Sequence, residues 1–173
     1  ITNDIILPPG GLENTQPRPS YYLLGGAGGG EDALWWDGGG ASEFFRDKQV
    51  NVISPRGAYG SMMSDWAQPH DTHGKYKWAT YLTKELPQLI DAEFHGNGRD
   101  GIAGLSNSGG PALELATFDP RFTVSGSFSG CPSTTGVLAQ TFAWASAAFY
   151  GTDPARSFGA PWDPAGAPHC LLY

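Results

Sequence analysis

Serine residues in a glycine-rich turn are the first feature of this sequence that could do chemistry. The stretch GIAGLSNSGGPALELA, residues 101 to 116, begins with apolar residues. Glycine and serine residues follow, and the pattern then continues as that of an amphipathic helix. A nucleophile elbow has this layout, because it holds a serine on a sharp turn from a strand to a helix, and small neighbours let the backbone bend. The stretch predicts either a nucleophilic serine or an ordinary glycine-rich turn.

Two serines compete for the nucleophile position. Gly104 stands two residues before Ser106, as the pattern G-x-S-x-G requires, but the residue two places after it is Ser108. Ser108 in turn has Ser106 two places before it and Gly110 two places after. The local pattern therefore leaves both serines open.

The segments around this turn alternate between strands and helices. Short apolar runs bounded by turn residues predict strands at 21 to 26, 50 to 54, 101 to 106 and 122 to 130. Helical spacing predicts helices at 41 to 47, with Ser42 as the N-cap, and at 76 to 94, 110 to 118 and 137 to 151. This order predicts an α/β fold, a mostly parallel sheet flanked by helices.

The longest predicted helix, residues 76 to 94, has one apolar stripe. Its members are Trp78, Tyr81, Leu82, Leu86, Leu89, Ile90 and Phe94. Pro87 lies inside the stripe and should kink the helix or divide it in two, because proline has no backbone N–H to donate.

Length and charge limit the classes of function. The 173 residues predict a single domain, 1 to 173, and the net charge of −7 argues against nucleic acid as a partner. No apolar run is long enough for a transmembrane segment. His70 and His73 lie in a loop-like stretch with no second group of ligands, so we expect no metal site. Cys131 and Cys170 are either free thiols or a disulfide, and the sequence leaves both open.

The order of several motifs resembles a known family. KYKWATYLTKELPQLIDAEF followed by GIAGLSNSGGPALELATFDPRFTVSGSFSG, with YYLLGG upstream and SMMSDW at 61 to 66, is similar to the mycolyltransferases of the antigen 85 type. These enzymes belong to the esterase D-like branch of the α/β-hydrolase fold. The family's elbow has a small residue other than glycine two places after the serine. The resemblance therefore implies that Ser106, and not Ser108, is the nucleophile.

The resemblance also implies an oxyanion hole made of two backbone amides. These would be the N–H of Asn107, directly after the nucleophile, and that of Ala27 in the glycine-rich loop after the first predicted strand. Trp35 and Trp36 have two open interpretations, as the lining of an acyl or sugar groove or as core residues. In the SDW element, Asp65 is expected to cap a turn beside a buried Trp66. No cofactor is implied.

The sequence departs from the family pattern in two places. The acid and histidine that should follow the nucleophile have no clear counterpart, so the chain resembles a C-terminally truncated family member. His169 is the only histidine after Ser106, but we expect the irregular tail, 152 to 173, to give it no rigid support as a base. Gly25 and Gly28 stand where the family holds sugar-binding groups, which puts trehalose binding in doubt.

The resemblance implies a serine acyltransferase that moves a long, mycolyl-type acyl group between sugar hydroxyls through a seryl ester, in a secreted or cell-envelope protein. Its substrates would be acyl esters or glycolipids, with a sugar or water as acceptor. Two alternatives stay open. One is a carboxylesterase of the esterase D type, and the other is a catalytically silent fragment that binds cell-envelope glycolipid or protein.

Overall fold

A computed structural model describes residues 1–31, 33–66, 68–69, 74–130, 137–151, 153 and 155. Five strands and five α-helices organise these residues, joined by two short 3-10 turns, Gly11–Glu13 and Ser106–Ser108, and one π-helical turn, Tyr81–Glu85. The strands are β1 (Thr2–Ile6), β2 (Arg18–Leu24), β3 (Asn51–Arg56), β4 (Gly96–Leu105) and β5 (Phe122–Phe128). The helices are α1 (Ala41–Phe45), α2 (Trp78–Thr80), α3 (Leu86–Phe94), α4 (Gly109–Phe118) and α5 (Val137–Phe149).

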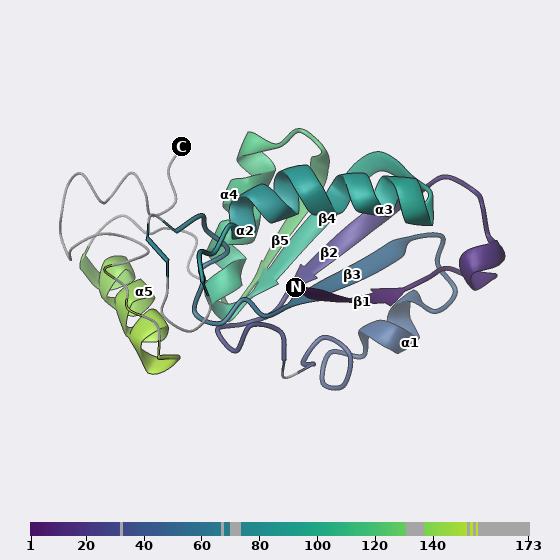
Figure 1. Ribbon diagram of the computed structural model, residues 1–173. Coiled ribbons are helices and arrows are strands. Elements are labelled where there is room, and N and C mark those ends of the chain that lie inside the picture. The colour runs from purple at the N-terminus through teal and green to yellow at the C-terminus, as the bar shows by residue number, and fades with distance from the viewer. Residues whose placement is uncertain are drawn as a thin grey trace.

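All five strands form one sheet in the order β1-β3-β2-β4-β5. Strands β3, β2, β4 and β5 are parallel, and β1 pairs antiparallel with β3 at one edge. The predicted mostly parallel sheet is confirmed. Because the parallel strands run the same way, the loops that follow β2, β3 and β4 all lie at one edge of the sheet, toward the end where α5 lies (Figure 1).

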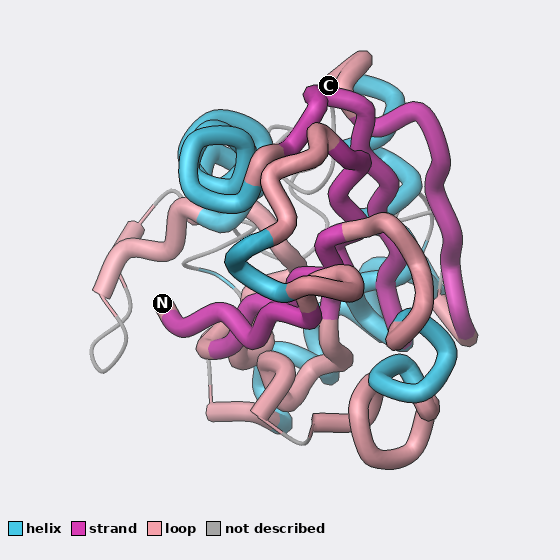
Figure 2. The backbone as a smooth tube through the Cα atoms, turned by 90° about the vertical axis from the view of Figure 1, so that its right-hand side faces the viewer, coloured by secondary structure: helices cyan, strands magenta, loops and turns pink. Residues whose placement is uncertain are grey.

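The two faces of the sheet are covered unequally. One face packs under α2, α3 and α4 in the main core, which holds Tyr22, Ile53, Trp78, Leu86 and Ile102 among others. The other face carries a smaller core of Leu23, Ala41, Val52 and Ala103, covered by the five-residue helix α1 and the loop before it. A view turned by 90° shows helical segments on both sides of the strands (Figure 2).

The helix predicted at 76 to 94 is divided, as its proline indicated. It begins at Trp78, widens into the π-helical turn, and resumes as α3 with Pro87 in its first turn. Because Pro87 cannot donate a backbone hydrogen bond, the break falls just before it. The apolar stripe is confirmed for Trp78, Leu82, Leu86 and Ile90, which are buried, but is wrong for Leu89, whose side chain is half exposed.

The predicted cap of the first helix is also wrong. Helix α1 begins at Ala41 after Gly40, which has a left-handed φ of 63° and makes no side-chain cap hydrogen bond. Ser42 therefore lies inside the first turn. A glycine can cap because it adopts positive φ without steric cost.

Candidate active site

Ser106 lies in the tight turn between β4 and α4. Its φ is +55°, a left-handed conformation that costs a non-glycine residue about 1–3 kcal/mol. Gly104 makes the turn sterically possible, because a Cβ there would overlap the backbone carbonyl of Ser108. This strand–turn–helix geometry is the one that a nucleophile elbow uses to present a serine at the end of a sheet.

The two competing serines differ in exposure. Ser106 is half-buried, whereas Ser108 is 1% exposed and its Oγ donates to Asn107 Oδ1 at 3.4 Å. A nucleophile must reach a substrate, so the accessible serine of this turn is Ser106.

The glycine-rich loop after β2 comes directly against Ser106. The register pairs Leu24 with Gly104, so the residues that follow each strand are neighbours. A Cβ built on Gly26 would lie 3.6 Å from Ser106 Cβ. Ala27 is the next residue, which puts its backbone at the same edge of the sheet as Ser106.

A second loop braces the glycine-rich loop. The N–H of Gly60 donates to the carbonyl of Ala27 at 3.0 Å, and the N–H of Gly57 donates to the carbonyl of Gly29 at 2.9 Å. Gly29 has a φ of +71°, and a Cβ there would lie 2.7 Å from the backbone nitrogen of Tyr59. Sequence reasoning missed this brace. The glycines at 57 and 60, just after a predicted strand, were the available signal.

Asn107, the other predicted oxyanion residue, is 4% exposed and stands in the first helical turn after Ser106. The first backbone N–H groups of a helix have no acceptor within it, and they carry the positive end of the helix dipole. The Asn107 amide is therefore in a position suited to a developing negative charge.

Trp35 and Trp36 contact different parts of the sheet. Trp35 Nε1 donates to the carbonyl of Leu24 at 3.0 Å, and its ring meets Phe128 edge to face at 5.5 Å between centroids. Trp35 also lines a hollow of about 300 Å³ on the α1 face of the sheet. Trp36 Nε1 instead donates to Asp4 Oδ2 on β1 at 3.0 Å.

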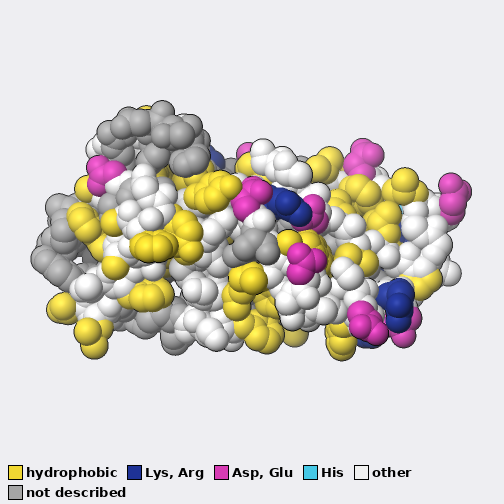
Figure 3. Space-filling view, turned by 90° about the horizontal axis from the view of Figure 1, so that it is seen from below, with side chains coloured by type: hydrophobic (Ala, Val, Ile, Leu, Met, Phe, Trp, Pro, Cys, Tyr) yellow, Lys and Arg dark blue, Asp and Glu magenta, His cyan; other side chains and the backbone are white. Residues whose placement is uncertain are grey.

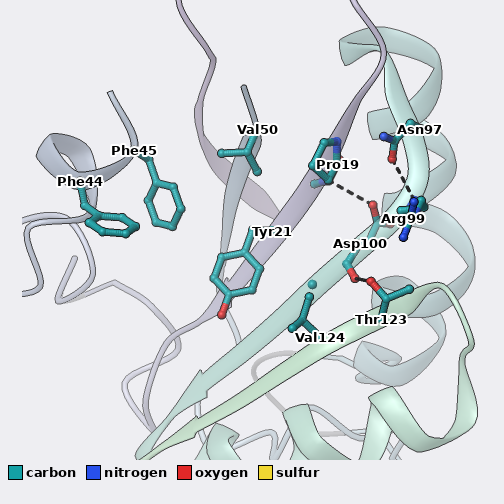
Figure 4. Close-up of a pocket in the computed structure, with 12 residues that line it drawn as sticks. Pro19, Tyr21, Phe44, Phe45, Val50, Asn97, Arg99, Asp100, Thr123 and Val124 are labelled. Atoms are coloured by element: carbon teal, nitrogen blue, oxygen red, sulfur yellow. Dashed lines mark hydrogen bonds between the residues drawn. The ribbon is translucent and has the colours of Figure 1, made fainter. Parts of the chain in front are cut away.

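A larger hollow, about 630 Å³, lies on the same face nearer the amino ends of the strands (Figure 4). Tyr21, Phe45 and Val124 line it from β2, α1 and β5. Ser106 lines neither hollow. Both hollows therefore lie apart from the elbow itself.

Histidine is scarce where the chain is described. Of the four histidines only His95 falls in these ranges, and its carbonyl accepts from the N–H of Arg18, at the start of β2 and thus opposite the elbow. His169 lies outside the described residues. So do His70, His73, Cys131, Cys170 and all of the tail from 152 except Asp153 and Ala155.

Asp65 acts as the expected cap. Its Oδ1 accepts from the Thr80 N–H at 3.0 Å, and its Oδ2 accepts from the Thr80 hydroxyl at 2.6 Å, while Trp66 is fully buried. Burial alone would raise the pKa of Asp65, but the hydrogen bonds from Thr80 and Lys77 outweigh it, and the pKa lies below its ordinary value. Asp65 therefore holds the start of the α2 segment.

A carboxyl group on α4 has a raised pKa. Glu114, on α4, is half-buried, and burial raises its pKa to about 7. Desolvation disfavours the charged carboxylate.

The parallel sheet, the strand–turn–helix at Ser106 and the loop against it define the α/β-hydrolase fold. The chain belongs to the esterase family whose model is described as "Putative esterase" and matches residues 1–169. It is similar to the diacylglycerol acyltransferase/mycolyltransferase Ag85B of Mycolicibacterium smegmatis, 42% identical over 96 residues, which are 52% of this chain and 29% of that protein. The Ag85B of Mycobacterium leprae is 35% identical over 133 residues, 72% of this chain and 40% of the relative.

A solved relative extends the match over the whole fold. The crystal structure of Mycobacterium tuberculosis MPT51 (FbpC1) superposes with a TM-score of 0.78 at 27% identity, covering 98% of this chain and 61% of that one. The chain thus spans less than two thirds of each of these three relatives.

Proposed function

We propose that the chain carries the nucleophile half of a serine acyltransferase, which moves a long, mycolyl-type acyl group between sugar hydroxyls. The left-handed Ser106 at the end of β4, with the Gly26 backbone against it, is the observation that carries the proposal. The names of the Ag85B relatives support the acyl chemistry.

In the proposed reaction the Ser106 hydroxyl oxygen attacks the carbonyl carbon of an acyl ester. The backbone N–H groups of Ala27 and Asn107 would hold the oxyanion that forms, and the donor alcohol would leave to give a seryl ester. A second hydroxyl then attacks that ester and takes the acyl group. The imidazole that accepts the serine proton has to come from outside the described residues, because His95 lies at the opposite edge of the sheet.

One observation favours the carboxylesterase alternative, in which water accepts the acyl group. A Cβ built on Gly25 would lie 2.5 Å from the Cα of Gly30, so no side chain fits there without moving the loop. Gly25 therefore offers no side chain to hold a sugar hydroxyl. Trehalose would then be a weak acceptor, and hydrolysis of the seryl ester would compete with transfer.

We also propose that residues 1 to 173 belong to one domain, since one sheet contains all five strands and the family model spans 1–169. Secretion to the cell envelope is part of the same proposal. It rests on the resemblance to the antigen 85 family and on acyl lipids as substrates.

Acylation by an activated ester tests the nucleophile. The chain is incubated with p-nitrophenyl butyrate, and the butyryl group is located by intact mass and peptide mapping. We expect slow acylation at Ser106, abolished in Ser106→Ala and retained in Ser108→Ala, the matched control. Acylation that survives Ser106→Ala and disappears in Ser108→Ala would contradict the assignment.

A further inference from the structure

Two successive residues just after the brace, the loop 57 to 60, have a strained backbone. Met62 and Met63 have φ values of +52° and +51°, in the left-handed region that glycine favours. For a residue with a Cβ this conformation is unfavourable, and it persists only where the surrounding structure fixes it. Both methionines are buried. Because strain of this kind is concentrated at functional sites, it indicates that the segment 57 to 66 serves the candidate active site.

Ser61 is at the centre of the hydrogen bonds that fix this segment. It is fully buried, and its Oγ accepts from the N–H of Met63 at 3.1 Å. Its backbone carbonyl accepts from Ser64 Oγ at 2.9 Å and from Trp66 Nε1 at 3.2 Å. Its own N–H donates to the carbonyl of Ala58, in the brace, at 3.0 Å. Ser61 therefore connects the brace to the strained turn and to a buried tryptophan.

The brace in turn fixes the peptide groups on both sides of Ala27. The carbonyl of Ala27 accepts from the Gly60 N–H at 3.0 Å. The carbonyl of Gly26 accepts from the Gly29 N–H at 3.0 Å, and the carbonyl of Gly29 accepts from the Gly57 N–H at 2.9 Å. In a planar trans peptide the N–H points away from the C=O, so holding the Gly26 carbonyl sets the direction of the Ala27 N–H.

The charge distribution makes the direction of this amide important. Seen from below, most Lys and Arg side chains lie at the centre and right, whereas mainly uncharged side chains lie at the left, the end where α5 and the elbow lie (Figure 3). Among the described side chains in this view, an oxyanion at that end would thus depend on backbone N–H groups rather than on a cation. Such donors stabilise a transition state only when they are already aimed at the developing charge.

We propose that Ser61 is a positioning residue for acyl transfer, because it acts through the brace to hold the Ala27 amide where the oxyanion forms. Ser64 shares this role, since its hydroxyl holds the Ser61 carbonyl. The effect on the reaction rests on the proposed function, whereas the connection of Ser61 to the glycine-rich loop does not. Loss of either hydroxyl should slow the chemical step and leave ester binding unchanged.

Amide hydrogen exchange tests the connection on the whole 173-residue chain. The N–H groups of Gly29 and Gly60 donate the hydrogen bonds on the two sides of Ala27, so their exchange rates, measured by NMR, report on both. We expect Ser61→Ala to raise both rates at least tenfold, because the brace opens more often. Ser64→Ala should do the same and is the second, independent variant.

Ser54→Ala is the matched control. It also removes a buried serine hydroxyl, which donates to the carbonyl of Leu23 at 2.9 Å, but this hydrogen bond lies within the sheet. The control should leave the exchange of Gly29 and Gly60 unchanged.

Acylation kinetics test the effect on the reaction. The rate of butyrylation at Ser106 is measured over a range of p-nitrophenyl butyrate concentrations. We expect Ser61→Ala to lower the limiting rate about tenfold or more at an unchanged half-saturating concentration, and Ser54→Ala to change neither. The p-nitrophenyl thionoester of the same acid is a second probe, because its sulfur accepts hydrogen bonds more weakly than oxygen. The ratio of ester to thionoester rates should fall in Ser61→Ala and stay constant in Ser54→Ala.

Two results would overturn the proposal. One is exchange at Gly29 and Gly60 that stays as slow as in wild type in the serine variants. The other is faster exchange with an unchanged acylation rate, which would make Ser61 a structural residue only. Thermal melting establishes that each variant is folded, and Ser64→Ala decides if Ser61→Ala does not fold. Butyrylation at a residue other than Ser106 would contradict the proposed function instead, and the exchange rates would still decide whether Ser61 holds the loop.

Discussion

The strain at Ser106 gives a stability prediction that is independent of activity. Because its φ is +55°, glycine should fit this position better than any residue with a Cβ. We expect Ser106→Gly to be more stable than Ser106→Ala by about 1 kcal/mol in urea unfolding. Equal stability of the two variants would mean that the turn relaxes in solution.

Because of Glu114, the stability of the folded protein should depend on pH. Its pKa in the folded state is about 7, above the ordinary value, so the folded chain holds the proton more tightly than the unfolded chain. The cost of the charged carboxylate is absent at low pH, grows as the pH rises between the two pKa values, and is full above about 7.

Replacing Glu114 with Gln removes that cost. We expect Glu114→Gln to unfold like wild type near pH 4 and to be more stable by about 1 kcal/mol near pH 8, a figure reduced because the side chain is partly exposed to water. Urea unfolding of the variant and the wild type at both pH values measures this difference in stability. A pH-independent difference would show that the carboxyl group does not titrate as described.

At the scale of the elements, the elbow depends on how closely α4 folds back over β4. A Cβ on Gly104 would overlap the backbone of Ser108, and backbone cannot move aside as a side chain can. We expect Gly104→Ala to destabilise the protein by about 1–3 kcal/mol and to abolish acylation of Ser106.

Gly126→Ala is the matched control for that change. It lies on the neighbouring strand, opposite Ala103, and its added Cβ would meet its nearest neighbour at 3.4 Å, an ordinary contact. The control should change the unfolding midpoint little. Equal effects of the two substitutions would contradict the close-approach argument.

The elements themselves were largely predictable, because their signals are local. Periodicity located four of the five strands and the helices, and Pro87 located the break before α3. Strand β1 was missed, because its polar start and short length give no apolar run, and its place depends on pairing with β3. The same limit applies to the brace at Gly57 and Gly60, to the exposure of Leu89, and to the packing of α5 against Met62. These contacts join residues distant in sequence.

At the scale of the whole molecule, the unequal cover of the sheet predicts association. Among the described strands β5 lies at an edge of the sheet, and its Val124 and Phe128 are 63% and 52% exposed on the face that α1 covers only partly. Exposed apolar edges of sheets pair with other chains. The hollow between Val124, Tyr21 and Phe45 adds apolar surface to the same face.

Two lysine substitutions on β5 test whether self-association uses the apolar α1 face or the backbone edge of the strand. We expect Val124→Lys to lower the self-association of the chain, measured by analytical ultracentrifugation over a range of concentrations, because it places a charge on the α1 face. Ser125→Lys adds the same charge to the same strand, but its partner in register, Ile102, faces the main core. Ser125→Lys should therefore leave association through the α1 face nearly unchanged. If both variants dissociate equally, the backbone edge of β5 drives association, since either lysine disturbs strand pairing. If neither does, copies of the chain meet through another surface.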